Sequence, residues 1–368
     1  MQSTRIWRHF DVWLLAAVAL LTIAGVAMIQ SAIAGNEFLI EQDTVPRQII
    51  YGLAGFVILF LTAAIDYRLW SALSRLLYLF ILFFLALIPT AGIVGFGSAR
   101  WFQLGIVTVQ PSELAKIFMI LVMADYLAKN QFRLHQIKIV MRSLLLIGVP
   151  ALLVFLQPDL STAIVLGVIW VALLWAAGVQ LKHFAILLGI GMLLPLFAWP
   201  FLENYQKARI ITFLFPDPEA GFGATYNVNQ ALIAIGSGGI FGQGYGSGTQ
   251  VQLRFLKVRH TDFIFSATAE ELGFVGVMVF MLLFAFVIFR CLRAAGMARD
   301  LYGALICYGV AVLLFFQGFF NIGVNLNVFP VSGLPLPFLS YGGSSLLTSL
   351  LAIGLVESVI LRHKQIEL

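Results

Sequence analysis

Charged residues are scarce in this 368-residue chain: they make up 11% of it, whereas hydrophobic residues make up 61% and the mean hydropathy is +0.98. Such a composition excludes a soluble domain. Alternating apolar and polar residues, the pattern of a membrane barrel, are also lacking. The apolar runs are instead continuous and about 20 residues long, the length of a membrane-spanning helix. Because backbone in lipid must satisfy its own hydrogen bonds, we expect helices, arranged as one all-α polytopic domain over residues 1–368.

Cysteine is nearly absent as well. Cys291 lies near a basic turn and Cys307 lies within an apolar run, so we expect neither a disulfide nor a metal site. No Walker-type phosphate loop, zinc-ligand spacing or dinucleotide fingerprint occurs, which argues against ATP as the direct energy source. The net charge of +5 indicates neither a nucleic-acid partner nor a basic tail.

Apolar segments separated by short polar loops predict ten membrane spans. The first is too long, and lacks a cleavage-like site, to be a removed signal peptide. The predicted spans cover residues 12–33, 47–65, 70–90, 111–128, 142–157, 160–179, 181–200, 263–289, 301–320 and 338–361.

The basic residues predict the orientation of these spans. With a cytoplasmic N-terminus, fourteen of the 22 Lys and Arg lie inside, seven lie outside and Lys116 lies within a span. Five of the outer seven belong to one long loop, where such residues count little. Both termini are therefore predicted to be cytoplasmic, and the loop at about 201–262 extracytoplasmic. Its aromatic and apolar residues predict a folded cap with a short helix at 227–240.

Charged groups inside membrane spans are costly unless they are paired or face water, so each is a candidate site residue. Lys116 shares a helix face with Glu113 and either forms a structural ion pair, snorkels to the surface or lines an outward-facing cavity. Asp159, in a first helical turn after a Gln-Pro pair, is either a well-made helix start or a site acid. Glu270 and Glu271 point about 100° apart, so at least one of them is expected to be structural.

Asp262 stands at the mouth of the eighth predicted span, directly after a basic segment with Arg254, Lys257, Arg259 and His260. From local residues alone, this acid is either a helix cap or a general base. The cations before it would keep the carboxylate ionised and would bind an anionic group, particularly a phosphate.

Two other outer segments complete the predicted site. Arg100 and Trp101 supply a cation and a large aromatic ring suited to sugars, although an interfacial tryptophan is most often a membrane anchor. Residues 321–345, including Asn321 and Ser340, are uncharged and dense in Asn, Pro, Gly and Ser, so they should line protein or a wet cavity. These residues together predict an outward-open polar cavity. They do not choose between an enzyme, a transporter and a scaffold for a partner.

Eight motifs are highly specific when taken together: ARW (99–101), QPSELAK (110–116), QPDLSTA (157–163), YQKARI (205–210), NQALIAIGSGGIFGQGYGSGTQ (229–250), HTDFIFSATAEELGF (260–274), NIGVN (321–325) and LPFLSYGGSS (336–345). With them, nearly the whole chain resembles the SEDS family (shape, elongation, division and sporulation) of bacterial peptidoglycan glycosyltransferases. The stretches GYGSGTQVQLRFL and GLPLPF are similar to the elongation (RodA) branch rather than the division (FtsW) branch.

The resemblance implies a ten-span enzyme that polymerises lipid II, an undecaprenyl-pyrophosphate-linked disaccharide-peptide, on the outer face of the bacterial cytoplasmic membrane. It makes Asp262 the catalytic residue, the general base of an inverting transfer. Arg209, Lys116 and Arg254 would stabilise the departing pyrophosphate, a role that a divalent cation (Mg or Mn) would share, although the sequence offers no ligand set for one. The full set of expected substrate-binding residues is Trp101, Lys116, Glu113, Arg209, Arg100, Arg254, His260, Asp159, Asn321 and Ser340.

The resemblance also implies partners: a class B penicillin-binding protein that supplies transpeptidation, and other cell-elongation membrane proteins. The chain departs from the family at Ser161, usually glycine, and at residues 255–258, which commonly read FLPE. The alternatives are a division-branch polymerase and a lipid II flippase, but the paired Gln-Pro helix starts give no sign of an inverted repeat. A pure scaffold would not need charges inside its spans.

Overall fold

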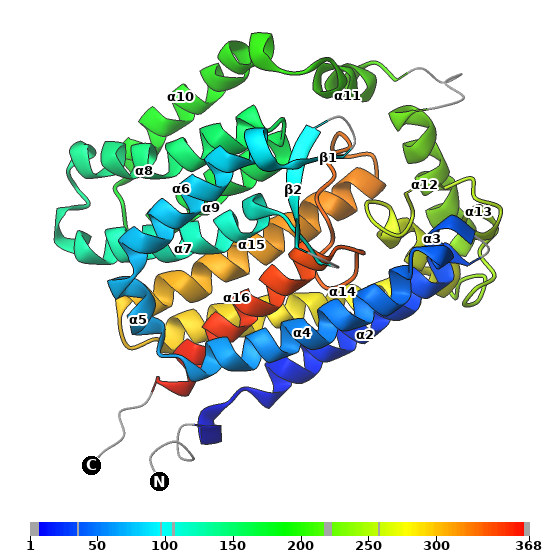
Figure 1. Ribbon diagram of the computed structural model, residues 1–368, viewed down its shortest axis with the longest axis horizontal. Coiled ribbons are helices and arrows are strands. Elements are labelled where there is room, and N and C mark those ends of the chain that lie inside the picture. The colour runs from blue at the N-terminus through cyan, green and yellow to red at the C-terminus, as the bar shows by residue number, and fades with distance from the viewer. Residues whose placement is uncertain are drawn as a thin grey trace.

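A computed structural model describes residues 7–34, 37–95, 98–104, 107–216, 223–256 and 258–363. Its long helices run alongside one another in an elongated bundle (Figure 1). Every predicted span overlaps one of them. These helices are α2 (Val12–Ile33), α4 (Thr44–Ala64), α6 (Ser74–Ala91), α7 (Pro111–Lys129), α8 (Ile137–Leu156), α9 (Leu160–Ala176), α10 (Leu181–Ala198), α14 (Ile264–Met297), α15 (Leu301–Asn325) and α16 (Gly343–Leu361).

Within the described ranges, seven helices are long and apolar enough to cross a membrane: α2, α4 with the residues before it, α8, α10, α14, α15 and α16. Helices α6 and α9 contribute shorter apolar segments. Helix α7 carries Glu113, Lys116 and Asp125 among its buried residues. The chain is therefore a multi-pass helical membrane protein.

Several predicted boundaries differ from the structure because helices do not end where an apolar run ends. Helix α14 continues to Met297, past its basic residues, and α15 continues through Asn321 to Asn325. The last helix begins only at Gly343, since Phe338 has a positive φ of 65° that interrupts a helix before it.

A small antiparallel sheet precedes α7, so the fold is not purely α-helical as predicted. It consists of β1 (Ile93–Gly95), β2 (Ser98–Leu104) and β3 (Val107–Val109), in that order. Trp101 pairs with Ile93, and Phe102 pairs with Val109. Val, Ile, Phe and Trp favour strands. The prediction considered only membrane spans and did not use this local signal. The sheet places Arg100 and Trp101 on a strand.

The predicted cap is folded. It contains α11 (Asn204–Leu214), α12 (Ala224–Gly238) and the short α13 (Thr249–Gln252). Helix α12 confirms the helix predicted at 227–240. In Figure 1, α12 and α13 lie at the right-hand end of the bundle, α11 lies above it, and the sheet lies nearer the middle. At the opposite end the His9 and His363 rings are 5.2 Å apart, so the two described chain ends meet there.

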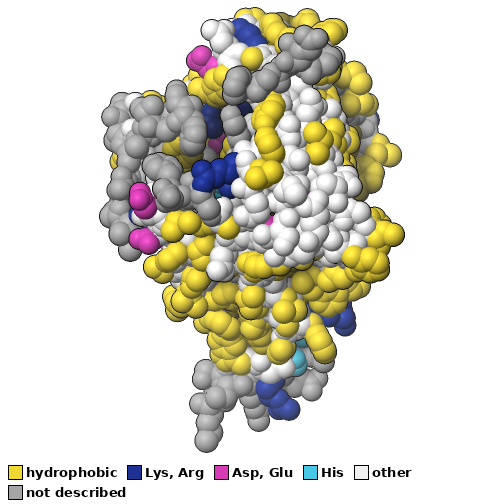
Figure 2. All heavy atoms as spheres, turned by 90° about the vertical axis from the view of Figure 1, so that its right-hand side faces the viewer, with side chains coloured by type: hydrophobic (Ala, Val, Ile, Leu, Met, Phe, Trp, Pro, Cys, Tyr) yellow, Lys and Arg dark blue, Asp and Glu magenta, His cyan; other side chains and the backbone are white. Residues whose placement is uncertain are grey.

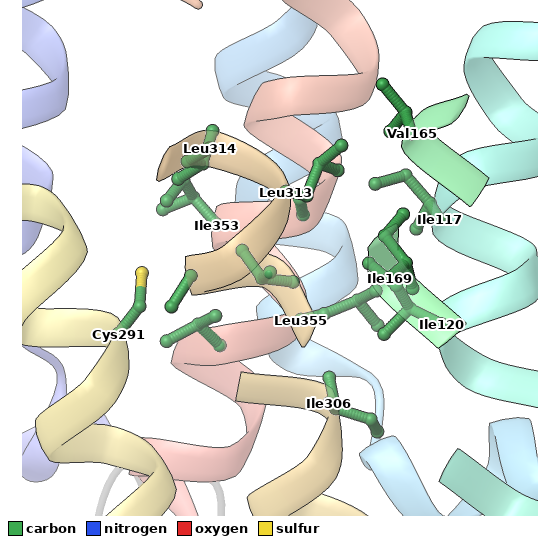
Figure 3. Close-up of a cluster of buried hydrophobic side chains, with 14 of the residues drawn as sticks. Ile117, Ile120, Val165, Ile169, Cys291, Ile306, Leu313, Leu314, Ile353 and Leu355 are labelled. Carbon is green, nitrogen blue, oxygen red and sulfur yellow. The ribbon is translucent and has the colours of Figure 1, made fainter. Parts of the chain in front are cut away.

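The core lies between α7, α9, α14, α15 and α16. Ile117 and Ile120 of α7 face Val165 and Ile169 of α9, while α15 and α16 contribute further leucines and isoleucines (Figure 3). Cys291 and Cys307 are buried and free in this core. Because this core holds α14 against α15, it fixes the residues at the start of α14 and the end of α15, where the candidate site lies.

Helix α14 is interrupted at Gly273, which has φ 67° and ψ −171°. The glycine-rich turn after α12 enters at this point. Backbone N–H groups of residues 243 and 244 donate to the carbonyls of Glu270 and Glu271 at 2.9 and 3.0 Å. Those of residues 274 and 275 donate to the carbonyls of residues 239 and 240 at 2.9 and 3.0 Å. The turn therefore replaces hydrogen bonds that the break removes, and it joins the cap to α14.

Candidate active site

Asp262 lies two residues before α14, and its backbone is held from two sides. Asn325 and Asn321 of α15 donate to the Asp262 carbonyl through Nδ2, at 2.9 and 3.2 Å. The Ser340 hydroxyl donates to the Thr261 carbonyl at 2.7 Å. Thus Asn321 and Ser340, predicted to bind substrate, here contact the backbone around Asp262.

The Asp262 carboxylate itself is half-buried. The N-cap of α14 is Phe263, so the structure does not use Asp262 as the helix cap. Within the described part of the chain, no hydrogen bond or ion pair engages the Asp262 carboxylate. It is therefore free to accept a proton from a bound molecule.

The surroundings of Asp262 tune its basicity. Burial raises the pKa of Asp262 to about 6, while the positive charge of Arg209 on α11 acts in the opposite direction. Burial, and then the charge of Arg259, lower the pKa of His260 to about 4, so this imidazole is neutral at pH 7. A carboxylate with a pKa near 6 is mostly ionised at neutral pH and is still basic enough to take up a proton in a transition state.

The cations before Asp262 have different surroundings. The Arg259 guanidinium is buried and donates to the carbonyls of Ala32, at the end of α2, and Leu256. It therefore anchors the segment to α2. Arg254 is exposed, and Lys257 lies outside the described residues. His260 faces the Tyr341 ring at 5.8 Å, and its carbonyl accepts from the Tyr341 N–H at 2.9 Å.

A cleft is bordered by β2, α9, α11, α15 and residues 330–334, and its empty space, open solvent included, is about 600 Å³. Two cations line it. Arg100 donates to the carbonyls of Gln157 and Pro158 and, at 2.7 Å, to the Tyr205 hydroxyl. The Arg209 guanidinium lies 5.5 Å from the centre of the Tyr205 ring. Figure 2 shows basic side chains gathered near the middle of this end of the molecule.

A second cleft, of about 340 Å³, shares Arg209, Pro330 and Val331 with the first. Its other lining residues are neutral and include hydroxyls, amides and aromatic rings: Thr212, Phe213, Pro216, Thr225, Val228, Asn229, Asn327 and Phe329. Neither lining includes Asp262, whose link to both clefts is the charge of Arg209. Arg209 thus lines both clefts and also acts on Asp262 through its charge.

Glu113 and Lys116 form the ion pair that was one of the predicted possibilities. Their charged atoms are 2.6 Å apart, and their side chains are only 6% and 1% exposed. The Thr348 hydroxyl of α16 donates to the other Glu113 oxygen at 3.4 Å. The structure therefore places this pair between α7 and α16, and the two linings described above do not contain it.

Asp159 is a helix start, the first of the two predicted alternatives. Its carboxylate caps α9 by accepting from Thr162 N at 3.2 Å. It also accepts from the Gln110 amide and the Ser112 hydroxyl at 3.3 Å each, which ties the start of α9 to the start of α7. Asp159 and its neighbour Ser161 line the first cleft as well.

The two adjacent acids of α14 point to different elements, as their spacing required. The Glu270 carboxylate accepts from the N–H groups of Gln250 and Val251, at 2.7 and 3.1 Å, and thereby holds the start of α13. The Glu271 carboxylate accepts from the Ser31 hydroxyl near the end of α2. Glu270 thus holds the cap to the bundle, whereas Glu271 ties α14 to α2.

Sequence reasoning missed Asn325, which contacts both Asp262 and the start of α14. The signal was present, because Asn321 and Asn325 are four residues apart and share one helix face.

A metal ligand set was not predicted. Among the described residues, no group of three or more His, Cys, Asp and Glu side chains is arranged to hold an ion.

The comparison with protein families decides the affiliation. The model of the FtsW/RodA/SpoVE cell cycle proteins matches residues 11–365. The chain belongs to the FtsW/RodA/SpoVE family.

Relatives in this family cover nearly the whole chain. A probable peptidoglycan glycosyltransferase FtsW of Coxiella burnetii is 37% identical over 96% of this chain and 97% of its own. The peptidoglycan glycosyltransferase MrdB of Escherichia coli K12 is 34% identical over 97% of this chain and 95% of its own. Relatives with either name match at similar identity, so overall similarity does not separate the branches of the FtsW/RodA/SpoVE family.

Solved structures of the family share the fold. A chain of a peptidoglycan synthase complex that coordinates polymerization and crosslinking superposes with a TM-score of 0.81 at 30% identity, covering 97% of this chain and 99% of that one. RodA of Thermus thermophilus superposes with a TM-score of 0.71 at 31% identity, covering 97% and 98%.

Proposed function

We propose that this chain is a peptidoglycan glycosyltransferase that polymerises lipid II, with Asp262 as its general base. The observation that carries the proposal is the free Asp262 carboxylate, with a pKa of about 6, beside the Arg209 cation that lines two clefts. The names of the FtsW and MrdB relatives support the same activity.

The reaction transfers the growing glycan to a new lipid II. The 4-hydroxyl of the N-acetylglucosamine of lipid II attacks C1 of the lipid-linked sugar at the end of the glycan. A new C–O bond forms with inversion, the C1–O bond to pyrophosphate breaks, and undecaprenyl pyrophosphate leaves. Asp262 accepts the hydroxyl proton, and Arg209 with Arg100 stabilises the charge on the departing pyrophosphate. A divalent cation would share this role, but the described residues contain no group of His, Cys, Asp and Glu side chains that would hold one.

The proposed membrane arrangement has ten spans, cytoplasmic termini and the clefts on the outer face of the cytoplasmic membrane. Its support is the bias of Lys and Arg toward one side, together with the meeting of His9 and His363 at the end of the bundle remote from the cap. This arrangement gives the clefts access to lipid II after its delivery to the outer leaflet.

We assign the enzyme to cell elongation and give it a class B penicillin-binding protein as partner. The elongation assignment rests on the GYGSGTQVQLRFL and GLPLPF stretches. The partner is supported by the synthase complex, which combines polymerization with crosslinking in one assembly.

Purified protein incubated with lipid II, with and without the partner, tests the proposed function. The expected product is a ladder of glycan strands that lysozyme digests. Movement of lipid II across liposome membranes without any polymer would instead identify a flippase.

Replacing Arg209 by glutamine should lower kcat/KM by about 10- to 100-fold, because a preorganised charge at the leaving group is lost. The positive charge of Arg209 lowers the pKa of Asp262, so its removal should raise this pKa. The pH at which the rate reaches half of its plateau should therefore move above about 6. Polymerisation rates measured across the pH range check both effects.

Lys207→Gln is the matched control, since it removes the same charge from the same helix at a residue that lines neither cleft. Its rate and its pH midpoint should stay close to those of the wild type. Equal effects of the two variants would show that only the net charge of α11 matters and would remove Arg209 from the proposed mechanism.

A further inference from the structure

The start of α14 is capped by a residue from another helix. Phe263, its N-cap, provides no side-chain hydrogen bond. The Asn325 side chain at the end of α15 takes this role, because its Oδ1 accepts from the Ser266 N–H at 3.1 Å and from the Ser266 hydroxyl at 2.6 Å. Ser266 N–H is one of the first-turn donors that a helix leaves without an internal partner. Asn325 therefore caps α14, a role that an Asp, Ser or Asn at the N-cap position of the helix itself usually has.

The other end of the same amide holds Asp262, the residue before the N-cap. Asn325 Nδ2 donates to the Asp262 carbonyl at 2.9 Å and to the Asn321 carbonyl at 2.9 Å. The residue is 0% exposed, and both its oxygen and its nitrogen are hydrogen-bonded. Only an amide fits this place, since one side needs an acceptor and the other needs donors.

This arrangement decides what the Asp262 carboxylate can do. Asp is a preferred capping residue at the start of a helix, and a carboxylate that accepts helix N–H groups is stabilised in its charged form and becomes a weaker base. A carboxylate engaged in that way would also point at its own helix and away from a substrate. In this chain the cap is supplied from α15, so the Asp262 carboxylate keeps no such partner among the described residues.

We propose that Asn325 is a positioning residue for the transfer reaction: it caps α14 in place of Asp262 and fixes the Asp262 backbone, so that the carboxylate stays available to the attacking hydroxyl. The inference rests on the proposed glycosyltransferase function. It assigns Asn325 no contact with substrate, and it separates the capping of α14 from the acceptance of the proton, two roles that one aspartate could not serve together.

The charged and titratable groups near Asp262 affect the pH at which its carboxyl ionises. Arg209 approaches from α11, and Arg259 and His260 belong to its own segment. The groups from α15 and from residues 336–341 that hold the segment are the amides of Asn321 and Asn325, the Ser340 hydroxyl and the Tyr341 N–H. The Asn325 side chain can therefore be changed without removing a charge from this set.

The test is the pH dependence of lipid II polymerisation by full-length Asn325→Ala. Without its cap, the first turn of α14 becomes available to the Asp262 carboxylate. We expect kcat to fall at least about tenfold with KM within about twofold, because orientation rather than binding is lost. The rising limb of the pH profile should move below the wild-type midpoint, since hydrogen bonds to a carboxylate favour its ionised form.

Two further variants keep the test decisive. Asn325→Asp retains an acceptor for Ser266 but exchanges the amide donors, so its kcat should also fall while its midpoint stays at the wild-type value or above it. Gln317→Leu changes another buried amide of α15 that has no bond to Asp262, and it should leave the midpoint unchanged.

The inference is overturned if Asn325→Ala is folded and keeps the wild-type kcat and midpoint. It is also overturned if Asn325→Ala and Gln317→Leu lose the same activity without any shift of the midpoint, because that pattern is one of general destabilisation. If Asn325→Ala does not fold, an Asn325→Asp variant with wild-type kcat overturns it. Failure of the proposed function would look different, since the wild-type protein would then make no polymer.

Discussion

Asp262→Asn is expected to polymerise lipid II roughly 10²–10⁴-fold more slowly than the wild-type protein, the loss that removal of a positioned general base produces. The amide is the same size as the carboxylate and cannot accept the hydroxyl proton. The fold should be unaffected, because α15 holds Asp262 through its backbone carbonyl, which the substitution leaves in place. Initial rates of glycan formation, measured with the partner present, check the expected loss.

Asp43→Asn provides the matched control. Asp43 is an exposed acid before α4 that makes no side-chain cap bond, and its positive φ of 53° suits asparagine. Its rate should equal that of the wild type. Comparable activity of Asp262→Asn and Asp43→Asn, at equal amounts of folded protein, would rule out Asp262 as the general base.

Gly273→Ala is expected to destabilise the protein by about 2–5 kcal/mol. A Cβ at this residue would lie 2.2 Å from the nitrogen of Gly242, so the backbone of the glycine-rich turn would have to move. Overpacking of this kind costs about 1–3 kcal/mol or more. The positive φ of 67° adds about 1–2 kcal/mol for a residue with a side chain. Thermal unfolding in detergent measures the loss.

Gly246→Ala separates the two costs. Its φ is 71°, close to that of Gly273, but a Cβ there would meet no described atom within 4 Å. Gly246→Ala should therefore lose only the stability that the positive φ costs a residue with a side chain, about 1–2 kcal/mol. If both variants unfold at the same temperature, then the contact of Gly273 with Gly242 contributes nothing, and the join between the cap and α14 is not tightly packed.

The membrane helices were predictable from the sequence because lipid imposes a simple rule on every span. Among the described residues, continuous apolar runs located ten long helices, seven of which are long and apolar enough to cross a membrane, and the glycine-bounded apolar segment located α12. The sheet was missed because residues 93–109 were judged only by their position between two spans. Their β-branched and aromatic residues carried the relevant signal.

The candidate site was predictable only in part, because its geometry depends on contacts between segments distant in the chain. Asp262, Arg209 and Asn321 were identified from their residue types and motifs. That Arg259 is buried against α2, and that Asn325 caps α14, depends on side-chain directions that spacing does not reveal. For Lys116, the sequence left open an ion pair, snorkelling to the surface and a cavity cation, and only the structure shows the pair with Glu113.

The pH dependence of the wild-type single-turnover rate tests the role of Asp262 most directly, because it needs no substitution. Burial raises the pKa of this carboxyl to about 6, and only its ionised form can accept a proton. The rate should therefore rise with pH, reach half of its plateau near pH 6 and stay high at neutral pH. A rate that is constant through this range, or that falls as the pH rises through about 6, would contradict the proposed mechanism.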